Sequence, residues 1–305
     1  MALSIHTNYS SLITQTNLGK TNSALGTNQQ RLGTGLRINS AADDAAGLQI
    51  ATRLNAQSRG MEVAIRNTGD AISLLQTAEG AFNEMTDIVQ RMKDLTTQGA
   101  NGTNSAHDLA ALQSEYNELG NELANIVKNT KYAGESLFSD GTVTDGSAGK
   151  FSDTMSFQIG ASSSETLALD ASGKLGTLTA ALTAISTNYE DGTTGVEIAD
   201  VDLTTTPPTI TANTANATIT LLETALNQIG SLRADFGANI NRLNHTANNL
   251  ANMKDNTDMS KGRIMDADFA KESANMSKNS MLMQSGISML KQAGQMPGMV
   301  MSLLG

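Results

Sequence analysis

The sequence predicts a mainly α-helical protein, a folded-back rod of long antiparallel helices that form a coiled-coil-like terminal hairpin and a helical bundle. Apolar residues recur at 3-4 spacing over long segments near both ends of the 305-residue chain, which is typical of paired helices. Only 6 Phe and 4 Tyr occur, without any Trp, so Leu, Ile, Met and Ala must fill the core. Gly, Ser, Thr and Asp dominate the middle of the chain, where we expect a small β-hairpin-rich insert.

The first long helix is predicted to begin near Ala42 and to end at Gly99 and the Asn101-Gly102 pair. Its apolar seam consists of Met61, Ile65, Thr68, Ile72, Leu75, Ala78, Phe82, Met85, Val89, Met92 and Leu95. A helix of about 55 residues would be roughly 80 Å long at 1.5 Å per residue. Such a length indicates a rod rather than an element of a globular domain.

Two further seams predict long helices on either side of the insert. The earlier one comprises Leu109, Leu112, Tyr116, Leu119, Leu123 and Ile126 and ends near Asn129. The later one comprises Ile219, Leu222, Leu226, Ile229, Arg233, Phe236, Ile240, Leu243, Ala247 and Leu250. Arg233 is its one polar interruption, and we expect this helix to continue to about Thr257.

Both ends of the chain carry weaker stripes in which small and polar residues alternate with apolar ones. The N-terminal stripe contains Ile5, Tyr9, Leu12 and Thr16, continued by Leu25 and Leu32. The C-terminal stripe contains Phe269, Ser273, Met276, Ser280, Met283, Ile287, Leu290 and Gly294. Isolated helices of this kind are marginal in water. We therefore expect the two ends to become ordered only when they pack.

The insert is expected to contain hairpin strands in short alternating runs. Residues 151–159 and 166–170 alternate in polarity and are separated by the turn-forming segment Gly160–Ser164. Thr204–Pro208 is linker-like.

The net charge of −10 is unevenly distributed. Residues 1–60 carry five Lys/Arg against two Asp, hence +3, and residues 261–305 carry five against three acids, hence +2, which leaves −15 for the middle. Nucleic-acid binding is disfavoured because it needs a concentrated basic surface. The nearly uncharged ends are suited to pack against copies of themselves.

Enzymatic chemistry is not expected, nor is any cofactor. His6, His107 and His245 are scattered, there is no Cys, and neither a His-Glu-x-x-His string nor a phosphate-binding glycine loop occurs. We also expect no transmembrane helix and no cleaved signal peptide, because no long apolar run and no basic start are present.

The densest motif is the segment Gln30–Ala51, in which a turn at Gly33 and Gly35 precedes a helix start. Ser40 is a plausible N-cap with Asp43 at the third helical position, a variant of the capping box. Asp43 and Asp44 favour the positive end of the helix.

This segment and several others resemble bacterial flagellins. The matching segments are Ala2–Asn8, Gln30–Ala51, Asn67–Gly80, Gly134–Phe138, Phe157–Gly160, Met276–Asn279 and Met289–Leu304. The resemblance covers roughly residues 1–170 and 219–305. It implies a secreted, non-enzymatic subunit that polymerises into the extracellular bacterial flagellar filament for motility.

The family architecture implies three regions. Residues 1–42 and 266–305 would pair as the terminal helical hairpin of an inner tube, and residues 43–170 and 219–265 would form the helical rod domain with its β-hairpin. Residues 171–218 stand where larger flagellins carry bulky outer domains. About 48 residues cannot build such domains, so we expect a small variable surface-exposed insert, either a small elaboration or an extended loop.

The resemblance also implies partners beyond other copies of the chain, whereas neither nucleic acid nor a membrane is expected. They are the filament cap and hook-junction proteins, an export chaperone on the C-terminal helix, and host innate immune receptors. Assembly residues would be Ile5, Tyr9, Leu12, Leu25, Leu32, Phe269, Met276, Met283, Ile287 and Leu290. The chaperone would bind Met276, Met283, Ile287 and Leu290, and receptors would face Arg91, Leu95 and Glu115. Export would proceed unfolded through the flagellar type III apparatus.

Other interpretations predict different features. A hook–filament junction protein should lack the full Gln30–Ala51 string and should not form long homopolymers. A surface coiled-coil adhesin or a phage fibre should show unbroken parallel heptads and should not need both ends.

Overall fold

The computed structural model describes residues 8–141, 144–146, 148–191 and 195–304. The chain divides into two compact units. The terminal unit comprises the described residues up to Ser58 together with those from Lys254 onward, and the central unit comprises Arg59–Met253. Each is considered by itself.

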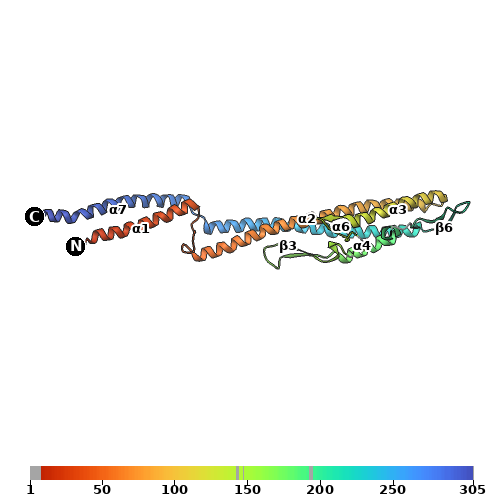
Figure 1. Cartoon of the computed structure of the whole chain (residues 1–305), viewed down its shortest axis with the longest axis horizontal. Helices are drawn as coiled ribbons and strands as arrows, with labels where there is room; N and C mark the ends of the chain where they lie inside the picture. Colours follow the sequence, from red (N-terminus) through yellow and green to blue (C-terminus); the bar gives the residue numbers. More distant parts are fainter. Residues whose placement is uncertain (1–7, 142–143, 147, 192–194, 305) are drawn as a thin grey trace. The chain divides into compact units, whose positions relative to one another are not determined.

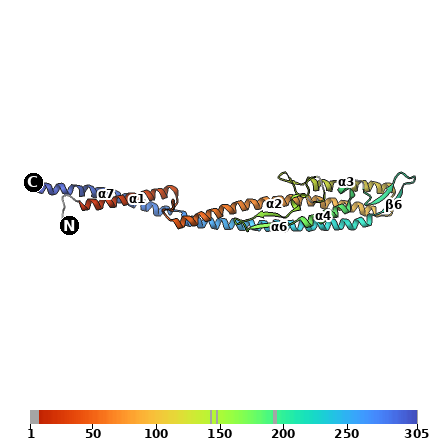
Figure 2. The ribbon, with the colours of Figure 1, turned by 60° about the horizontal axis from the view of Figure 1, so that its bottom comes forward.

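The terminal unit contains a pair of antiparallel helices, α1 (Tyr9–Thr34) and α7 (Phe269–Leu304). They lie side by side in both Figure 1 and Figure 2. The Asn8 amide donates to the Ala293 carbonyl at 2.6 Å, and near the other end of α1 Arg31 contacts Glu272. These two contacts establish the antiparallel register of the predicted hairpin.

Local hydrogen bonds define the ends of these helices. The Asn8 side chain accepts from the Ser11 amide and caps α1, and Gly35 ends α1 in the left-handed region at φ 71°. Asp268 caps α7 by accepting from the amides of Ala270 and Lys271 at 3.0 and 3.1 Å. Helix α1 therefore begins and ends, and helix α7 begins, where the sequence supplies groups that satisfy the terminal backbone.

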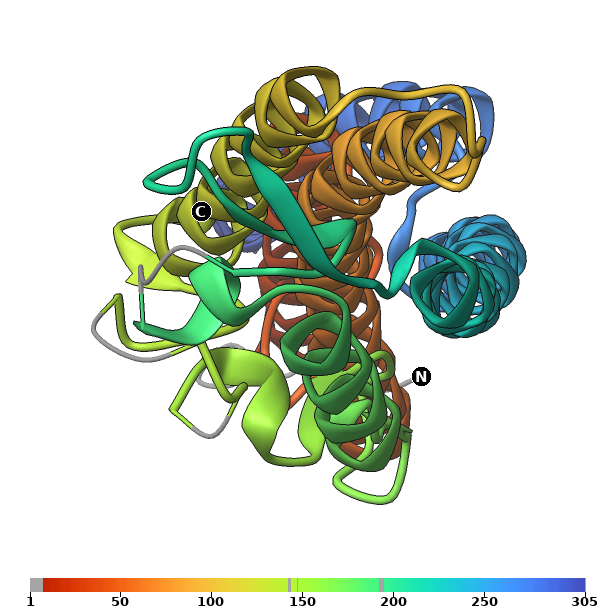
Figure 3. The same ribbon diagram turned by 90° about the vertical axis from the view of Figure 1, so that its right-hand side faces the viewer.

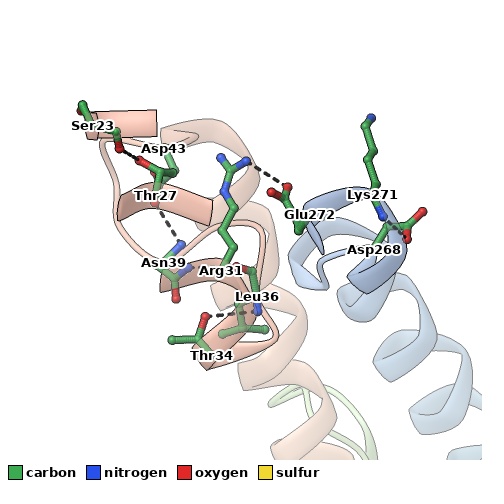
Figure 4. Close-up of polar contacts among 10 residues, drawn as sticks. All are labelled: Ser23, Thr27, Arg31, Thr34, Leu36, Asn39, Asp43, Asp268, Lys271 and Glu272. Atoms are coloured by element: carbon green, nitrogen blue, oxygen red, sulfur yellow. Dashed lines mark hydrogen bonds and ion pairs between the residues drawn. The ribbon is translucent and has the colours of Figure 1, made fainter. Parts of the chain in front are cut away.

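Helix α2 (Ala45–Gly99) is 55 residues long, as expected, but its start corrects the predicted cap. The Gly47 amide donates to Asp44 Oδ1 at 2.8 Å, so Asp44 is the N-cap. Ser40 instead closes a turn with Asp43, whose carboxylate accepts from the Ser40 amide at 2.9 Å; Figure 4 shows the equivalent bond from Asn39. The Ser40–Asp43 contact has only one of the two hydrogen bonds of a capping box, because the Asp43 amide donates to the Ser40 carbonyl at 3.1 Å rather than to the Ser40 hydroxyl. The residues between them are in a turn rather than a helix.

The central unit is built from α2, α3 (Ala106–Asn129) and α6 (Ala215–Met265). Four of the six phenylalanines meet in its core, and the ring centroids of Phe82 lie 5.0 Å from Phe138 and 5.5 Å from Phe236. Phe151 lies 5.1 Å from Phe236. This cluster joins two helices to the irregular segments after α3, and all four rings are fully buried.

The seam of α6 is shifted by one residue from the prediction at three positions. Thr218 and Ala225 are buried, whereas the predicted Ile219 and Leu226 are only half-buried. Leu232, not Arg233, is buried between Ile229 and Phe236, which restores unbroken 3-4 spacing. Helix α6 also extends beyond the predicted end near Thr257 to Met265. The prediction relied on apolar spacing, which ends near Leu250. The polar residues that follow still have enough helix propensity to continue the helix.

The strands form three separate antiparallel pairs: β1 (Lys131–Tyr132) with β2 (Glu135–Ser136), β3 (Met155–Gln158) with β4 (Thr166–Leu169), and β5 (Ala199–Asp202) with β6 (Thr209–Asn213). A short 3-10 turn, η1 (Lys150–Ser152), precedes β3. The β3–β4 pair confirms the predicted hairpin. The linker-like segment Thr204–Pro208 connects β5 to β6.

Residues 171–218 are not an extended loop. They contain α4 (Ser172–Ile185) and α5 (Thr187–Asp191) as well as β5 and β6, which lie in front of the helices in the end-on view of Figure 3. Leu175, Leu178 and Leu182 on α4 are buried in the same core as the phenylalanines. An ion pair between Lys174 and Asp235 connects α4 to α6. This segment therefore covers part of the bundle.

A buried phenol connects this segment to α3. The Tyr116 hydroxyl donates to the Ile185 carbonyl at 2.6 Å. Burial of the phenol, with a smaller contribution from the Glu197 carboxylate, raises the pKa of Tyr116, so it remains a protonated donor. Nearby, Gln113 accepts from the Ile198 amide at 2.7 Å and Asn188 donates to the Asn117 carbonyl at 2.9 Å.

We predict that Tyr116→Phe lowers the free energy of unfolding by about 1–2 kcal/mol, because it leaves the Ile185 carbonyl buried without its donor. Chemical unfolding of the monomer followed by circular dichroism measures this. Tyr132→Phe is the matched control, since its hydroxyl contacts the Asp70 carbonyl at 3.3 Å at the surface; its effect should stay within about 0.5 kcal/mol. Equal effects would contradict the proposed role of the buried bond.

Candidate functional site

The two helices of the terminal unit meet along a seam of mostly small and polar residues. On α1 the less exposed positions follow 3-4 spacing: Ser11, Thr14, Leu18, Thr21, Leu25, Asn28 and Leu32. On α7 the corresponding positions are Glu272, Met276, Asn279, Met283, Gly286, Leu290 and Ala293. We call these two rows the hairpin seam.

The hairpin seam is tightly packed around Gly286. At Gly286, an added Cβ would lie 3.0 Å from the Leu18 side chain, which is tighter than ordinary van der Waals contact. The glycine leaves room for the Leu18 side chain to lie against the α7 backbone. Because eight of the fourteen seam positions are small or polar, the seam buries less apolar area, and contributes less stability, than rows of large apolar residues would.

Large apolar side chains remain on the outside of this helix pair. Tyr9 is 63% exposed and Leu12 57% exposed. Among the side chains whose exposure the structure describes, those that form what we call the outer apolar set are Tyr9, Leu12, Ile13, Phe269, Met281, Leu282, Ile287 and Met289. A helix pair that functions alone in water normally directs such residues inward. Their exposure leaves substantial apolar surface available for packing against another protein.

The residues predicted for assembly fall on both faces of the terminal helices. Tyr9, Leu12, Phe269 and Ile287 belong to the outer apolar set. Leu25, Leu32, Met276, Met283 and Leu290 are half-buried in the hairpin seam. Ile5 lies outside the described residues.

Sequence reasoning missed part of the seam of α1 because most of its members are polar or small. Of the predicted stripe, Tyr9, Leu12 and Thr16 face outward, whereas its continuation at Leu25 and Leu32 lies in the seam. The seam also includes Asn28 and Glu272, each only 7% exposed. A 3-4 periodicity of small residues could have indicated Ser11, Thr14 and Thr21, but no sequence signal marks Asn28 or Glu272 as buried.

The connection between α1 and α2 is held to the end of α6. The Arg37 amide donates to the Met265 carbonyl at 2.6 Å, and its guanidinium donates to the Ile264 carbonyl at 2.8 Å. Within this connection, hydrogen bonds from the backbone amides of Asn39 and Ser40 hold the pKa of the Asp43 carboxyl below its usual value. The Ser58 hydroxyl lowers the pKa of Asp258 in the same unit.

The residues predicted to face immune receptors do not all reach the surface. Arg91 donates to Glu115 Oε1 through two nitrogens, at 2.6 and 2.9 Å, and both side chains are exposed. Leu95 is 1% exposed and belongs to the core of the central unit. The prediction for Leu95 is therefore wrong, because the position lies on the α2 seam and its side chain points into the bundle.

Binding through surfaces is the chemistry that this arrangement supports. Over the described ranges, His, Asp and Glu side chains do not gather in threes as a metal ion would require. None of the helices in the described part of the chain combines the length and hydrophobicity needed to cross a bilayer.

Two family models match the chain. The bacterial flagellin N-terminal helical region matches residues 5–144, and the bacterial flagellin C-terminal helical region matches residues 219–304. Residues 145–218 lie between them. The two models together span well over half of the chain, including both helices of the terminal unit.

Curated relatives match over their full length. The chain is 35% identical over 394 residues to Flagellin A of Vibrio anguillarum and 36% identical over 389 residues to Polar flagellin B/D of Vibrio parahaemolyticus, with 100% of each chain covered. Both alignments are longer than the 305 residues here, so the relatives contain additional residues. Together with the unmatched middle, this indicates a short central region.

Two solved structures are similar. A Bacillus cereus flagellin is 32% identical, with 61% of this chain and 88% of that chain covered at a TM-score of 0.44. A structure described as a flagellar hook-associated protein from Vibrio parahaemolyticus is 16% identical, with 73% of this chain and 100% of that chain covered at a TM-score of 0.53. At that identity the second likeness concerns the fold alone.

We predict that the turn formed by Asn39, Ser40 and Asp43 persists well into acid. Because the pKa of Asp43 is lowered on folding, its hydrogen bonds contribute stability above the ordinary Asp pKa of about 4 and lose it as pH falls through the lower folded value. Amide chemical shifts of Asn39 and Ser40, followed by NMR from pH 7 to pH 2, should therefore show a midpoint below about 4. Asp43→Asn should abolish this transition, and a midpoint at or above the ordinary value would contradict the assignment.

Proposed function

The chain belongs to the bacterial flagellin family, and from that premise we propose that it polymerises through the outer apolar set of its terminal helices. Members of this family are structural proteins, and the chain is a structural subunit of a flagellar filament. The observation that carries the proposal is the exposure of eight large apolar side chains on one pair of helices. Burying them against neighbouring copies would supply the free energy of assembly.

The charge of the terminal segments and the packing of their helices also support assembly through the outer apolar set. The two terminal segments have small net charges, +3 for residues 1–60 and +2 for residues 261–305, so copies can approach each other without strong repulsion. The hairpin seam is small and polar, which leaves α1 and α7 weakly paired within one chain. Contacts between copies must then exceed roughly 1–2 kcal/mol of backbone entropy for each residue that they order.

A repeated contact of this kind generates a filament. When different surfaces of each copy meet and the rotation between copies does not close a ring, the assembly grows as an open helix. In our proposal residues 1–42 and 266–305 line the inner tube of that helix, and residues 43–170 and 219–265 form the domain outside it. Residues 171–218 then form the small outer elaboration, and filament cap and hook-junction proteins contact the ends of the polymer.

We further propose that the chain is secreted unfolded through the flagellar type III apparatus, with a chaperone on α7 beforehand. The chaperone would contact Met276, Met283, Ile287 and Leu290, because Met side chains adapt to different partners. Three of these residues are half-buried against α1, while Ile287 is 44% exposed. Chaperone and α1 would therefore occupy the same face of α7 in turn.

Host innate receptors are a proposed partner of the exposed pair formed by Arg91 and Glu115. An arginine held by a carboxylate presents an ordered, charged feature on α2 and α3. The assembly of the chain does not require this role, since a receptor recognises whatever surface the filament subunit presents.

The alternative, a hook–filament junction protein, predicts a chain that does not form long homopolymers. The fold similarity to a hook-associated protein is compatible with it, but the relatives with 34–36% identity over full length carry flagellin names. A polymerisation assay therefore distinguishes a filament subunit from a junction protein.

We predict that full-length protein seeded with short filament fragments forms long tubular filaments, whereas protein lacking residues 1–30 and 276–305 stays monomeric. Electron microscopy and sedimentation measure both. Full-length protein that stays monomeric with seeds from its own cell would favour the junction protein.

Point variants sharpen this experiment. Leu12→Asn should raise the critical concentration about tenfold or more, because burying a leucine contributes about 1.5–3 kcal/mol. Val196→Asn and Leu203→Asn are matched controls, since these residues are 52% and 49% exposed but lie in the central unit. Equal impairment by the controls would contradict a specific role for the outer apolar set.

We predict that Arg91→Ala lowers activation of an animal innate receptor by about tenfold, as the loss of one charged contact at an interface allows. The free energy of unfolding should change by less than about 1 kcal/mol, because the ion pair is exposed. Reporter cells treated with monomer measure activation. Lys93→Ala, which removes the comparable exposed pair with Glu223, is the control and should leave activation unchanged; unchanged activation by Arg91→Ala would exclude the proposed contact.

A further inference from the structure

A buried polar cluster interrupts the hairpin seam near the C-terminal end of α1. Asn28 and Glu272 are each 7% exposed although both occupy seam positions. Arg31 contacts Glu272 across the two helices (Figure 4), and its Nη1 lies 3.3 Å from Glu272 Oε1. We call Asn28, Arg31, Glu272 and Asn279 the polar cluster.

Hydrogen bonds connect the four side chains across the two helices. With the Asn28 amide oriented to match its neighbours, its nitrogen donates to Glu272 Oε2 at 3.2 Å and to the Ala24 carbonyl at 3.3 Å. The Asn28 oxygen then accepts from Asn279 Nδ2 at 3.1 Å. Each carboxylate oxygen of Glu272 thus has a partner on α1. Among the described residues, Arg31 Nε is one of the few buried side-chain atoms without a partner.

The remainder of the hairpin seam does little to select one register. Its α1 row is largely Ser, Thr and Leu, and its α7 row contains Met, Gly, Leu and Ala. Methionines fit irregular spaces, and small residues present no large knob that fits a single hole. Sliding such surfaces by one heptad replaces each contact by a similar one.

The same slide changes the surroundings of Glu272 entirely. One heptad earlier on α1, Thr21 and Ala24 stand where Asn28 and Arg31 stand now. In the other direction the equivalent positions, 35 and 38, lie beyond the end of α1. Either shift would bury the Glu272 carboxylate without its cationic partner, which is strongly unfavourable.

We propose that the polar cluster specifies the register in which α1 and α7 pair. A single buried polar residue is known to fix register in coiled coils at some cost in stability. Here the incompletely paired Arg31 guanidinium is consistent with such a cost. A one-heptad slip would displace α1 residues of the outer apolar set relative to those of α7 by about 10 Å. Under the proposed function the correct register therefore also creates the correct assembly surface.

Disulfide trapping tests the inference, because the chain has no cysteine of its own. The pair L18C with G286C reports the observed register, since these positions are in contact. The pair L18C with A293C reports a slip of one heptad. Full-length protein is oxidised with diamide, both as monomer and after seeding, and intramolecular disulfides are quantified by peptide mass spectrometry. The parent should form the first disulfide at least tenfold more than the second.

The decisive variant replaces the cluster with apolar residues, N28L with R31L and E272L. Such replacement often preserves or raises stability, so the helices should still pair while the two disulfide yields approach within about twofold. If circular dichroism shows that this variant loses helix, the neutral variant R31Q with E272Q is used instead. Its two disulfide yields should also approach each other within about twofold. The charge swap R31E with E272R should restore much of the preference. K271M changes an exposed neighbour and is the control. It should leave the preference for the first disulfide unchanged.

A tenfold preference that survives removal of the cluster would overturn the proposal, as would a parent chain with no preference in either state. A parent that shows the observed register but does not polymerise would contradict the proposed function and leave the register inference standing.

Discussion

Apolar burial along the seams between long helices is the interaction on which the rest of the structure depends. With so few aromatic residues, the central unit gathers four phenylalanines at one place, where α2 and α6 meet the segments after α3. Leucines and methionines extend the same core along the helices. Because a helix of 55 residues is stable only when such a face is covered, the strand pairs and α4 are positioned by the seams that they cover.

In the terminal unit the apolar residues are distributed in the opposite way. Its seam is small and polar, and its large apolar residues face outward. Apolar area that one chain cannot bury by itself is available to another chain, so weak pairing within the subunit and the proposed packing between subunits have the same structural origin. The proposed assembly through the terminal helices rests on this distribution.

Polar groups give specificity where apolar contacts do not. In the central unit, directed hydrogen bonds attach Ile185, Asn188 and Ile198 to Tyr116, Asn117 and Gln113 of α3. In the terminal unit, Arg31 and Glu272 meet across the hairpin seam. A buried polar group without its partner costs more than a lost apolar contact, so such groups select one arrangement among several of similar burial. The short central region is thereby attached to the bundle rather than left as a loop.

The sequence by itself determined the long helices, the β3–β4 hairpin and the membership in the flagellin family, because helix seams and alternating strands are written in local periodicity. The tertiary structure decided which faces are covered. It replaced Arg233 by Leu232 in the seam of α6 and made Asp44 rather than Ser40 the cap of α2. The polar seam of α1 and the packing of α4 were also beyond sequence reasoning. The physical reason is that burial depends on the partner surface: small and polar residues become a seam only when another helix approaches them, and no local pattern specifies that approach.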